Sequence, residues 1–346
     1  DDPVYLVQHI SRQADVAGIK SLLAGMPNLM VQWVQSGVRA REVSRILTAI
    51  SDAVTVRLIQ LAEQDLGPAP VPWCWLGFGS QARGEQLLGA DQDNGIVISD
   101  DYQSQHAHWF AALAERVCDG LDACGYTYCN GKVMATTDDW RQPLAIWRET
   151  VERWTRTPTP DAVMRVSIFF DLRAVYGDSA LCEALQQTML EKAGQNTIFQ
   201  AALAANALDS RPPLGIFRRF VVDRNGEHAD QLDLKKRGVL PVTEIVRLHA
   251  LANGVAAVNT SERLEALAAA GALTLVDSRN LADALNYIQQ RRVSHQCEQI
   301  LAGEDVGNFL NPRSLPKMAK EQLRDAFTII DEAQSAVRQR YRAGLG

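Results

Sequence analysis

The residues that could do chemistry are concentrated in one short stretch of the 346-residue chain. Gly79 and Ser80 follow the apolar run at residues 73–78, and Asp91 and Asp93 stand shortly before another apolar run. Glycine lets the backbone approach an anion closely, serine offers a hydroxyl, and the amides that open a helix attract phosphate. We interpret Gly79 and Ser80 as a phosphate-binding turn within a strand, turn, short helix and strand.

Asp91 and Asp93 supply the other half of this chemistry. Side chains alternate between the two faces of a strand, so these two carboxylates should point the same way and Gln92 the opposite way. Two carboxylates on one face repel each other unless a cation lies between them, and oxygen ligands suit Mg²⁺ bound together with substrate phosphates. A solvated Asp-x-Asp turn is the alternative, and the nearby Gly79 and Ser80 make it the weaker one. The pattern predicts Mg²⁺ or Mn²⁺ held with a nucleoside triphosphate (NTP).

These residues resemble the signature of the nucleotidyltransferase superfamily, a hydrophobic-Gly-Ser turn followed by an Asp-x-Asp pair and one more strand carboxylate. Arg83 and Glu85 narrow the resemblance to nucleotidyltransferases related to the uridylyltransferase that modifies the PII signalling protein. Ala90 is a departure, because the family usually has Ser or Thr there; this removes a hydroxyl and not a ligand. The resemblance continues through residues 129–135, 169–173, 177–178 and 233–235.

Asp171 is the third carboxylate that the resemblance implies. Residues 166–172 are apolar and aromatic apart from Ser167 and Asp171, and we predict a buried strand, on which an ionised aspartate needs a partner. A metal ion or Arg173 could be that partner, and the resemblance favours the metal. It implies that Asp91, Asp93 and Asp171 form one catalytic and metal-binding cluster.

Two cationic side chains near this stretch are candidates for nucleotide contacts. Arg83 could contact a phosphate or a base, or it could pair with Glu85 or Asp91; we favour a nucleotide role for Arg83 and a structural pairing for Glu85. Lys132 lies in a glycine-containing loop from which it could reach a triphosphate, although exposed loop lysines are usually only solvated.

The C-terminal part offers two further cations. Lys235 and Asp233 should share one face of a short strand, where they could line the cleft or merely pair with each other. Arg247 is a weaker candidate for a position opposite the phosphates. The nucleotide-binding set that we predict is Gly79, Ser80, Arg83, Lys132 and Lys235.

Composition excludes several classes of function. The chain has 35 basic and 41 acidic residues and a net charge of −6, which argues against a broad nucleic-acid surface. Its six cysteines show no Cys-x-x-Cys spacing, which argues against zinc and disulfides and favours the reducing cytoplasm. No apolar run approaches the ~18 residues that a membrane span needs. We therefore expect a cytoplasmic protein with neither nucleic acid nor membrane as a partner.

The pattern along the chain predicts an α+β fold in three parts. Residues 1–66 should form an N-terminal helical segment, 67–178 a small mixed β-sheet nucleotidyltransferase core, and 179–346 a C-terminal, mainly helical bundle. An apolar stripe at helical spacing in residues 43–61 must pack on something. Residues 223–226 should form a hairpin turn between extended runs at 216–222 and 231–234.

The function that these features predict is metal-dependent transfer of a nucleoside monophosphate from an NTP to a protein or small-molecule hydroxyl, with release of pyrophosphate. Asp171 would help to activate the acceptor, and Gly79 and Ser80 would seat the β- and γ-phosphates. The main alternative is a nucleotide-sensing module that binds without transfer, and a weaker one is a scaffold whose helical ends bind partners.

The resemblance also implies partners outside this sequence. Relatives commonly carry upstream regulatory modules of the cystathionine-β-synthase (CBS) or cyclic-nucleotide-binding type, so we expect the chain, which begins at Asp1, to be a catalytic fragment. The apolar stripe of the first helices could serve a homodimer as well as the core of one chain.

Overall fold

The computed structural model describes residues 2–215, 219–222 and 226–342. The chain forms two compact units. The first comprises Asp1–Val38, Glu42–Trp154 and Arg165–Met189, and the second Arg39–Arg41, Thr155–Met164 and Leu190–Gly346. The first helices and the candidate site therefore belong to one unit, and most of the C-terminal half belongs to the other.

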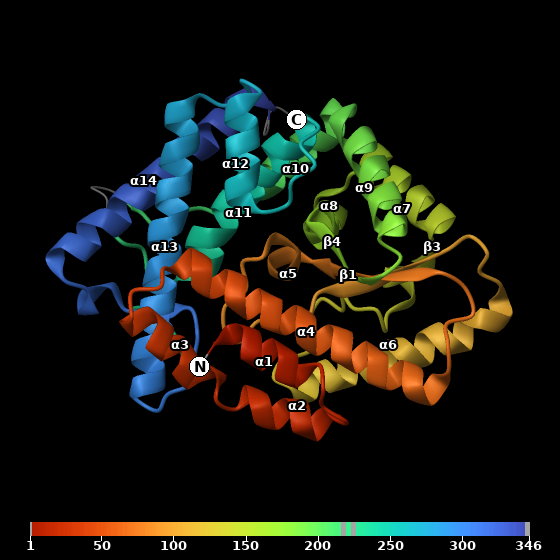
Figure 1. Cartoon of the computed structure of the whole chain (residues 1–346). Coiled ribbons are helices and arrows are strands. Elements are labelled where there is room, and N and C mark those ends of the chain that lie inside the picture. The colour runs from red at the N-terminus through yellow and green to blue at the C-terminus, as the bar shows by residue number, and fades with distance from the viewer. Residues whose placement is uncertain (1, 216–218, 223–225, 343–346) are drawn as a thin grey trace. The chain divides into compact units, whose positions relative to one another are not determined.

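The first unit contains a four-stranded mixed sheet in the order β3-β2-β1-β4 (Figure 1). Its strands are β1 (Trp73–Phe78), β2 (Asn94–Ile98), β3 (Arg141–Pro143) and β4 (Leu172–Gly177). Strand β1 runs antiparallel to β2 and β4, and β2 runs parallel to β3. Every residue of β1 and β2 is buried, as their continuous apolar sequences require. The predicted α+β class with a small mixed sheet is confirmed.

Helices make up most of the N-terminal half. They are α1 (Pro3–Ile10), α2 (Val16–Leu23), α3 (Met26–Gln35), α4 (Ala40–Leu66), α5 (Gly79–Arg83), α6 (Ala107–Ala123), α7 (Leu144–Arg156), α8 (Pro160–Val166) and α9 (Ser179–Gly194). The predicted apolar stripe lies on α4, where Val43, Ile50 and Val54 are fully buried, so it packs into a core as expected. Helix α4 ends at Gly67, whose φ is +83° and whose N–H donates to Glu63 O at 2.9 Å.

The second unit is mainly helical. Its elements include α10 (Thr197–Asp209), β5 (Leu232–Asp233), a π-helix (Lys235–Val239), α11 (Leu240–Ala252), α12 (Thr260–Ala269), α13 (Leu275–Leu301), β6 (Phe309–Leu310) and α14 (Lys317–Arg340). Val246, Leu285 and Phe327 belong to the apolar core that joins α11, α13 and α14. The predicted C-terminal helical bundle is confirmed.

The predicted hairpin around residues 223–226 lies partly outside the described residues. Of its first extended run, residues 219–222 are described, and Phe220 forms an isolated antiparallel bridge with Leu214. The second run, at 231–234, contains the two-residue strand β5, which pairs antiparallel with β6. None of the helices within the described ranges is long and apolar enough to span a membrane.

A buried histidine links α11 to the end of α14 in the second unit. His249 is 4% exposed, and its Nδ1 lies 2.8 Å from the hydroxyl oxygen of Tyr341. Burial, together with the nearby charge of Arg340, lowers the pKa of His249 to about 4. The folded protein therefore holds this imidazole neutral at pH values where an unfolded chain would protonate it.

His249 should make stability depend on pH. Its folded pKa lies below its usual value of 6.5, so its contribution is complete above pH 6.5 and declines as the pH falls toward 4. The decline should reach about 3 kcal/mol of unfolding free energy. Urea unfolding followed by circular dichroism at several pH values should show a smaller decline for His249→Gln than for the wild type. Substitution of the exposed His108 by Gln should leave the decline unchanged, and equal slopes for all three proteins would contradict the assignment.

Candidate functional site

The predicted phosphate turn lies where β1 ends and α5 begins. Gly79 has a φ of +59°, and its N–H donates to Asp171 O at 3.1 Å, while Phe78 N–H donates to Asp93 O at 2.9 Å. A Cβ added to Gly79 would lie 3.5 Å from Asp93 Oδ2. The turn is thus flanked by Asp93 on one side and Asp171 on the other. Glycine is favoured here by the positive φ and by the side chain of Ile168, whose Cδ1 would lie 3.0 Å from an added Cβ.

The turn is anchored to α4. Gln81 Nε2 donates to Asp52 Oδ1 at 3.0 Å, and Gln86 N–H donates to Thr48 Oγ1 at 3.1 Å. Arg173 pairs with Asp52 at 2.9 Å and donates to Gln81 O at 2.8 Å. Arg173 was one of the two partners that the sequence suggested for Asp171, and that alternative is wrong because Asp52 takes its guanidinium.

The acid pair precedes β2 instead of lying on it. Strand β2 begins at Asn94, so the prediction that Asp91 and Asp93 are strand residues is wrong. The predicted alternation nevertheless holds: Asp91 is exposed, Gln92 is 3% exposed, and Asp93 is half-buried. Gln92 is fixed inward because its Nε2 donates to Cys118 O at 2.8 Å and to Tyr126 O at 2.9 Å.

The loop at residues 127–135 runs alongside the acid pair. Gln92 N–H donates to Thr127 O at 2.8 Å, and Asn94 N–H donates to Val133 O at 3.1 Å. The hydroxyl of Thr127 donates to Asp91 Oδ1 at 2.7 Å. The motif at 129–135 that carries part of the resemblance is therefore a wall of the candidate site.

Two residues of this loop stand out. Burial and the charge of Asp93, to which the thiol is also hydrogen-bonded, raise the pKa of Cys129. Sequence reasoning missed Cys129 and Thr127, since nothing local marks a side chain that will contact a distant carboxylate. Lys132 is exposed and has a φ of +58°, which is uncommon outside glycine. Its proposed contact with a triphosphate stays a prediction.

Asp171 is fully buried and ion-paired. Arg83 Nη1 lies 2.7 Å from Asp171 Oδ2, and Arg83 Nε lies 3.3 Å from Glu85 Oε1. Arg83 is 8% exposed. Burial alone would lower the pKa of Arg83, but the charges of Glu85 and Asp171 outweigh it and raise the pKa. The structural pairing expected for Glu85 is observed, because Glu85 pairs with Arg83. The nucleotide contact expected for Arg83 stays a prediction.

The environment of Asp171 corrects one expectation. The predicted strand at 166–172 is wrong: α8 ends at Val166, residues 167–170 form a 3₁₀ turn, and β4 begins at Leu172. A continuous apolar run does not distinguish strand from buried helix by its period. Across residues 2–215, 219–222 and 226–342, no three His, Cys, Asp or Glu side chains converge as a metal site, and the cluster of Asp91, Asp93 and Asp171 that the resemblance implies stays a prediction.

Lys235 belongs to the second unit and begins its π-helix. The expectation that Asp233 and Lys235 share a strand face is wrong, because β5 ends at Asp233. Asp233 Oδ1 accepts a hydrogen bond from Lys236 N–H at 2.9 Å and so caps the helix that follows. Arg247 lies on α11 and is 4% exposed. Nucleotide contacts by Lys235 and Arg247 stay predictions.

Gly79→Ala should destabilise the turn. The new Cβ would meet Ile168 Cδ1 at 3.0 Å, and the positive φ alone costs a non-glycine residue about 1–2 kcal/mol. The matched control is Gly25→Ala, because Gly25 has a helical φ of −84° and no atom within 4 Å of an added Cβ. Urea unfolding should show a lower free energy of unfolding for Gly79→Ala than for the wild type and an unchanged one for Gly25→Ala. Equal free energies for the two variants would contradict a turn that requires glycine.

Arg83→Met should destabilise the protein by about 3–5 kcal/mol, because it leaves the carboxylate of Asp171 buried without its cationic partner. Arg45→Met should cost less than about 1 kcal/mol, because the pair of Arg45 and Glu42 is exposed. Adding Asp171→Asn to Arg83→Met should recover part of the loss in a denaturant titration. If Arg83→Met lowered the unfolding free energy by less than about 1 kcal/mol, the buried pair would not be a major source of stability, and this result would contradict the prediction.

Comparison with protein families gives two matches along the chain. Residues 24–161 match the model described as Putative nucleotidyltransferase DUF294, and residues 197–341 match the model described as Putative nucleotidyltransferase substrate binding domain. No curated protein matches the chain. The first match contains the turn at Gly79 and the acid pair, and the two matches together span well over half of the sequence. The chain belongs to the putative nucleotidyltransferase family DUF294.

Proposed function

We propose that the protein transfers a nucleoside monophosphate from an NTP to a hydroxyl group of a protein or small molecule, releasing pyrophosphate, with Mg²⁺ or Mn²⁺. Membership of a nucleotidyltransferase family supports the transfer reaction. The observation that carries the proposal is the position of Asp93, whose carboxylate would lie 3.5 Å from a Cβ at Gly79. A carboxylate this close to a phosphate-binding turn would repel the phosphates unless a cation lay between them.

The donor set fits such a cation in part. Asp91 and Asp93 offer carboxylate oxygens from positions two residues apart, and Mg²⁺ is commonly held by one or two carboxylates together with substrate phosphates. We assign the cation to these two residues. Asp171 fits less well as a third ligand, since its Oδ2 is bound by Arg83 at 2.7 Å. Its metal-binding and catalytic roles stay predictions and require that pair to open.

In the proposed reaction, one bond to the α-phosphorus forms and another breaks. The oxygen of the acceptor hydroxyl forms a bond to the α-phosphorus, the bond from that phosphorus to the bridging oxygen breaks, and pyrophosphate leaves with the electron pair. When bound, the cation supplies charge neutralisation and a lower pKa of the acceptor hydroxyl. The hydroxyl proton must leave to a base, for which Asp171 is the candidate once it is free of Arg83.

Gly79 and Ser80 would seat the β- and γ-phosphates in different ways. The N–H of Gly79 is already donated to Asp171 O, so Gly79 contributes by lacking a side chain. Ser80 is partly exposed and offers its hydroxyl. Lys132 would approach the triphosphate from the loop at 127–135, and a nucleotide contact by Lys235 stays a prediction.

Nucleotide sensing without transfer is the second candidate, and the buried pair of Arg83 and Asp171 favours it. If that pair stays closed when nucleotide binds, the third carboxylate cannot act as a base. Upstream CBS or cyclic-nucleotide-binding modules, a homodimer and a cytoplasmic location stay predictions, the last resting on six unpaired cysteines.

Label transfer distinguishes the two candidates. NTPs radiolabelled at the α-phosphate, with Mg²⁺ and cell extract, should label an acceptor and release pyrophosphate. Asp93→Ala and Asp91→Asn should each reduce the rate at least about 100-fold, because each removes a proposed cation ligand. Asp101→Asn, at an exposed carboxylate beyond the other end of β2, should leave it unchanged. Nucleotide binding without transfer would favour the sensor, and transfer that survives loss of both Asp91 and Asp93 would contradict the proposed site.

A further inference from the structure

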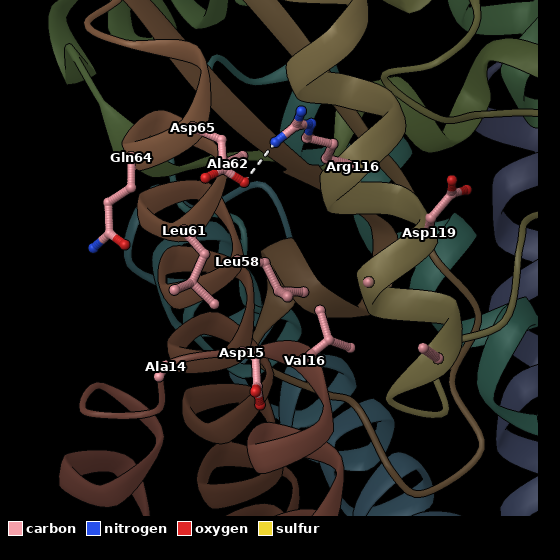
Figure 2. Close-up of a pocket in the computed structure, with 12 residues that line it drawn as sticks. Ala14, Asp15, Val16, Leu58, Leu61, Ala62, Gln64, Asp65, Arg116 and Asp119 are labelled. Atoms are coloured by element: carbon pink, nitrogen blue, oxygen red, sulfur yellow. Dashed lines mark hydrogen bonds and ion pairs between the residues drawn. The ribbon is translucent and has the colours of Figure 1, made fainter.

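A cavity lies in the first unit, away from the acid pair, lined by residues from the start of α2, the last turns of α4 and the C-terminal half of α6 (Figure 2). Its volume is about 560 Å³. Pockets for small molecules typically have volumes of roughly 300–1,000 Å³. The size of this cavity therefore suits a small organic ligand.

The middle of the cavity is apolar. Val16, Leu58 and Leu61 lie at the centre of the lining residues, as Figure 2 shows, and Ala62 and Ala123 also line it. Gly120 lets α6 approach α4, because a Cβ there would lie 2.7 Å from Leu58 Cδ2. A ligand that fills this space must present hydrocarbon to it.

The rim of the cavity is acidic. Asp15, Asp65 and Asp119 lie around the apolar centre, and Arg116 is the one cation among its lining residues, all of which the structure describes. Arg116 Nη1 lies 2.8 Å from Asp65 Oδ2, but the two side chains are 48% and 70% exposed, so this pair contributes little and is easily rearranged. Three carboxylates against one guanidinium leave the rim negatively charged.

We propose that this cavity binds a small organic cation with an apolar body, such as a primary alkylamine. Its hydrocarbon would cover Leu58 and Leu61, and its ammonium group would reach the carboxylate of Asp119, because Asp65 is already paired with Arg116. A neutral ligand would leave the charge of the rim uncompensated, and an anion would be repelled.

One contact leads from this cavity to the acid pair. Asp119 Oδ1 accepts a hydrogen bond from Tyr128 Oη at 2.7 Å, and Tyr128 stands next to Thr127, whose hydroxyl holds Asp91. The hydrogen bond to Asp119 raises the pKa of Tyr128 to about 12, so this phenol stays a donor at neutral pH. An ammonium group bound to the carboxylate of Asp119 would compete with the hydroxyl of Tyr128 for that carboxylate. A displaced Tyr128 would shift the neighbouring Thr127 and so alter its hydrogen bond to Asp91. This coupling, unlike the binding itself, rests on the proposed function.

Binding is tested on the full chain with hexylamine as the probe, and with hexanol and hexanoate as its neutral and anionic counterparts. Hexylamine should bind about tenfold more tightly than hexanol, the gain expected from one charge-assisted hydrogen bond, and hexanoate should bind least. Titrations followed by NMR should show that Asp119→Asn removes this preference and that Ala123→Trp, which fills the cavity from an exposed position, abolishes binding.

Glu115→Gln is the matched control, because Glu115 is an exposed acid on the same helix that does not line the cavity. It should bind hexylamine like the wild type. The site would be overturned by equal affinities for the three probes or by hexylamine binding that persists in Ala123→Trp. It would also be overturned if Glu115→Gln reduced the preference for hexylamine as much as Asp119→Asn does. Binding of a basic peptide but not of hexylamine would overturn the assignment to a small ligand.

Coupling is tested by measuring NTP affinity with and without saturating hexylamine. The affinity should change at least about twofold in the wild type and not in Tyr128→Phe, which lacks the hydroxyl that joins the two sites. An unchanged affinity in the wild type would overturn the coupling and leave the cavity assignment intact. Absence of NTP binding under all conditions would count against the proposed function instead.

Discussion

The buried ion pair between Arg83 and Asp171 is the constraint around which the candidate site is arranged. A fully buried carboxylate must have a partner, and Arg83 provides one from α5 while it also pairs with Glu85. The pair therefore joins α5 to the start of β4. The backbone bond from Gly79 N–H to Asp171 O joins the same two elements, so the turn is held at both of its ends.

The acid pair depends on a different kind of support. Asp91 and Asp93 are not part of the sheet ladder, and a polar segment outside a ladder needs other partners for its backbone. The loop at 127–135 supplies them through Thr127 and Val133, and Gln92 turns inward to bond two carbonyls. Asp93 O also accepts a hydrogen bond from Phe78 N–H at 2.9 Å, so the end of β1 holds the acid pair together with the loop.

Local features of the sequence predicted much of this arrangement. The turn at Gly79, the alternation of Asp91 to Asp93, the small mixed sheet and the helical C-terminal half follow from residue type and spacing within short windows. The ion pair did not, since Arg83 and Asp171 are 88 residues apart and either could have had another partner.

Two misassigned segments have the same origin. Residues 166–172 are so uniformly apolar that their period carries no information, and the sequence suited a buried strand as well as the helix and turn that form. Lys235 was assigned to a strand face, yet β5 ends at Asp233, whose carboxylate accepts a hydrogen bond from Lys236 N–H in the helix that follows. In each case the deciding contact lies outside the window that sequence reasoning could use.

Helix α4 contacts the phosphate-binding turn with one part of its length and lines the acid-rimmed cavity with another. Thr48 and Asp52 hold the turn, and Leu58 to Asp65 form a wall of the acid-rimmed cavity, which begins about 9 Å farther along at 1.5 Å per residue. Inserting a single amino acid between Asp52 and Leu58 would rotate one set against the other by about 100°, since a helix has 3.6 residues per turn. Length variation among natural or engineered versions of this protein should therefore be confined to its loops, and α4 should tolerate none.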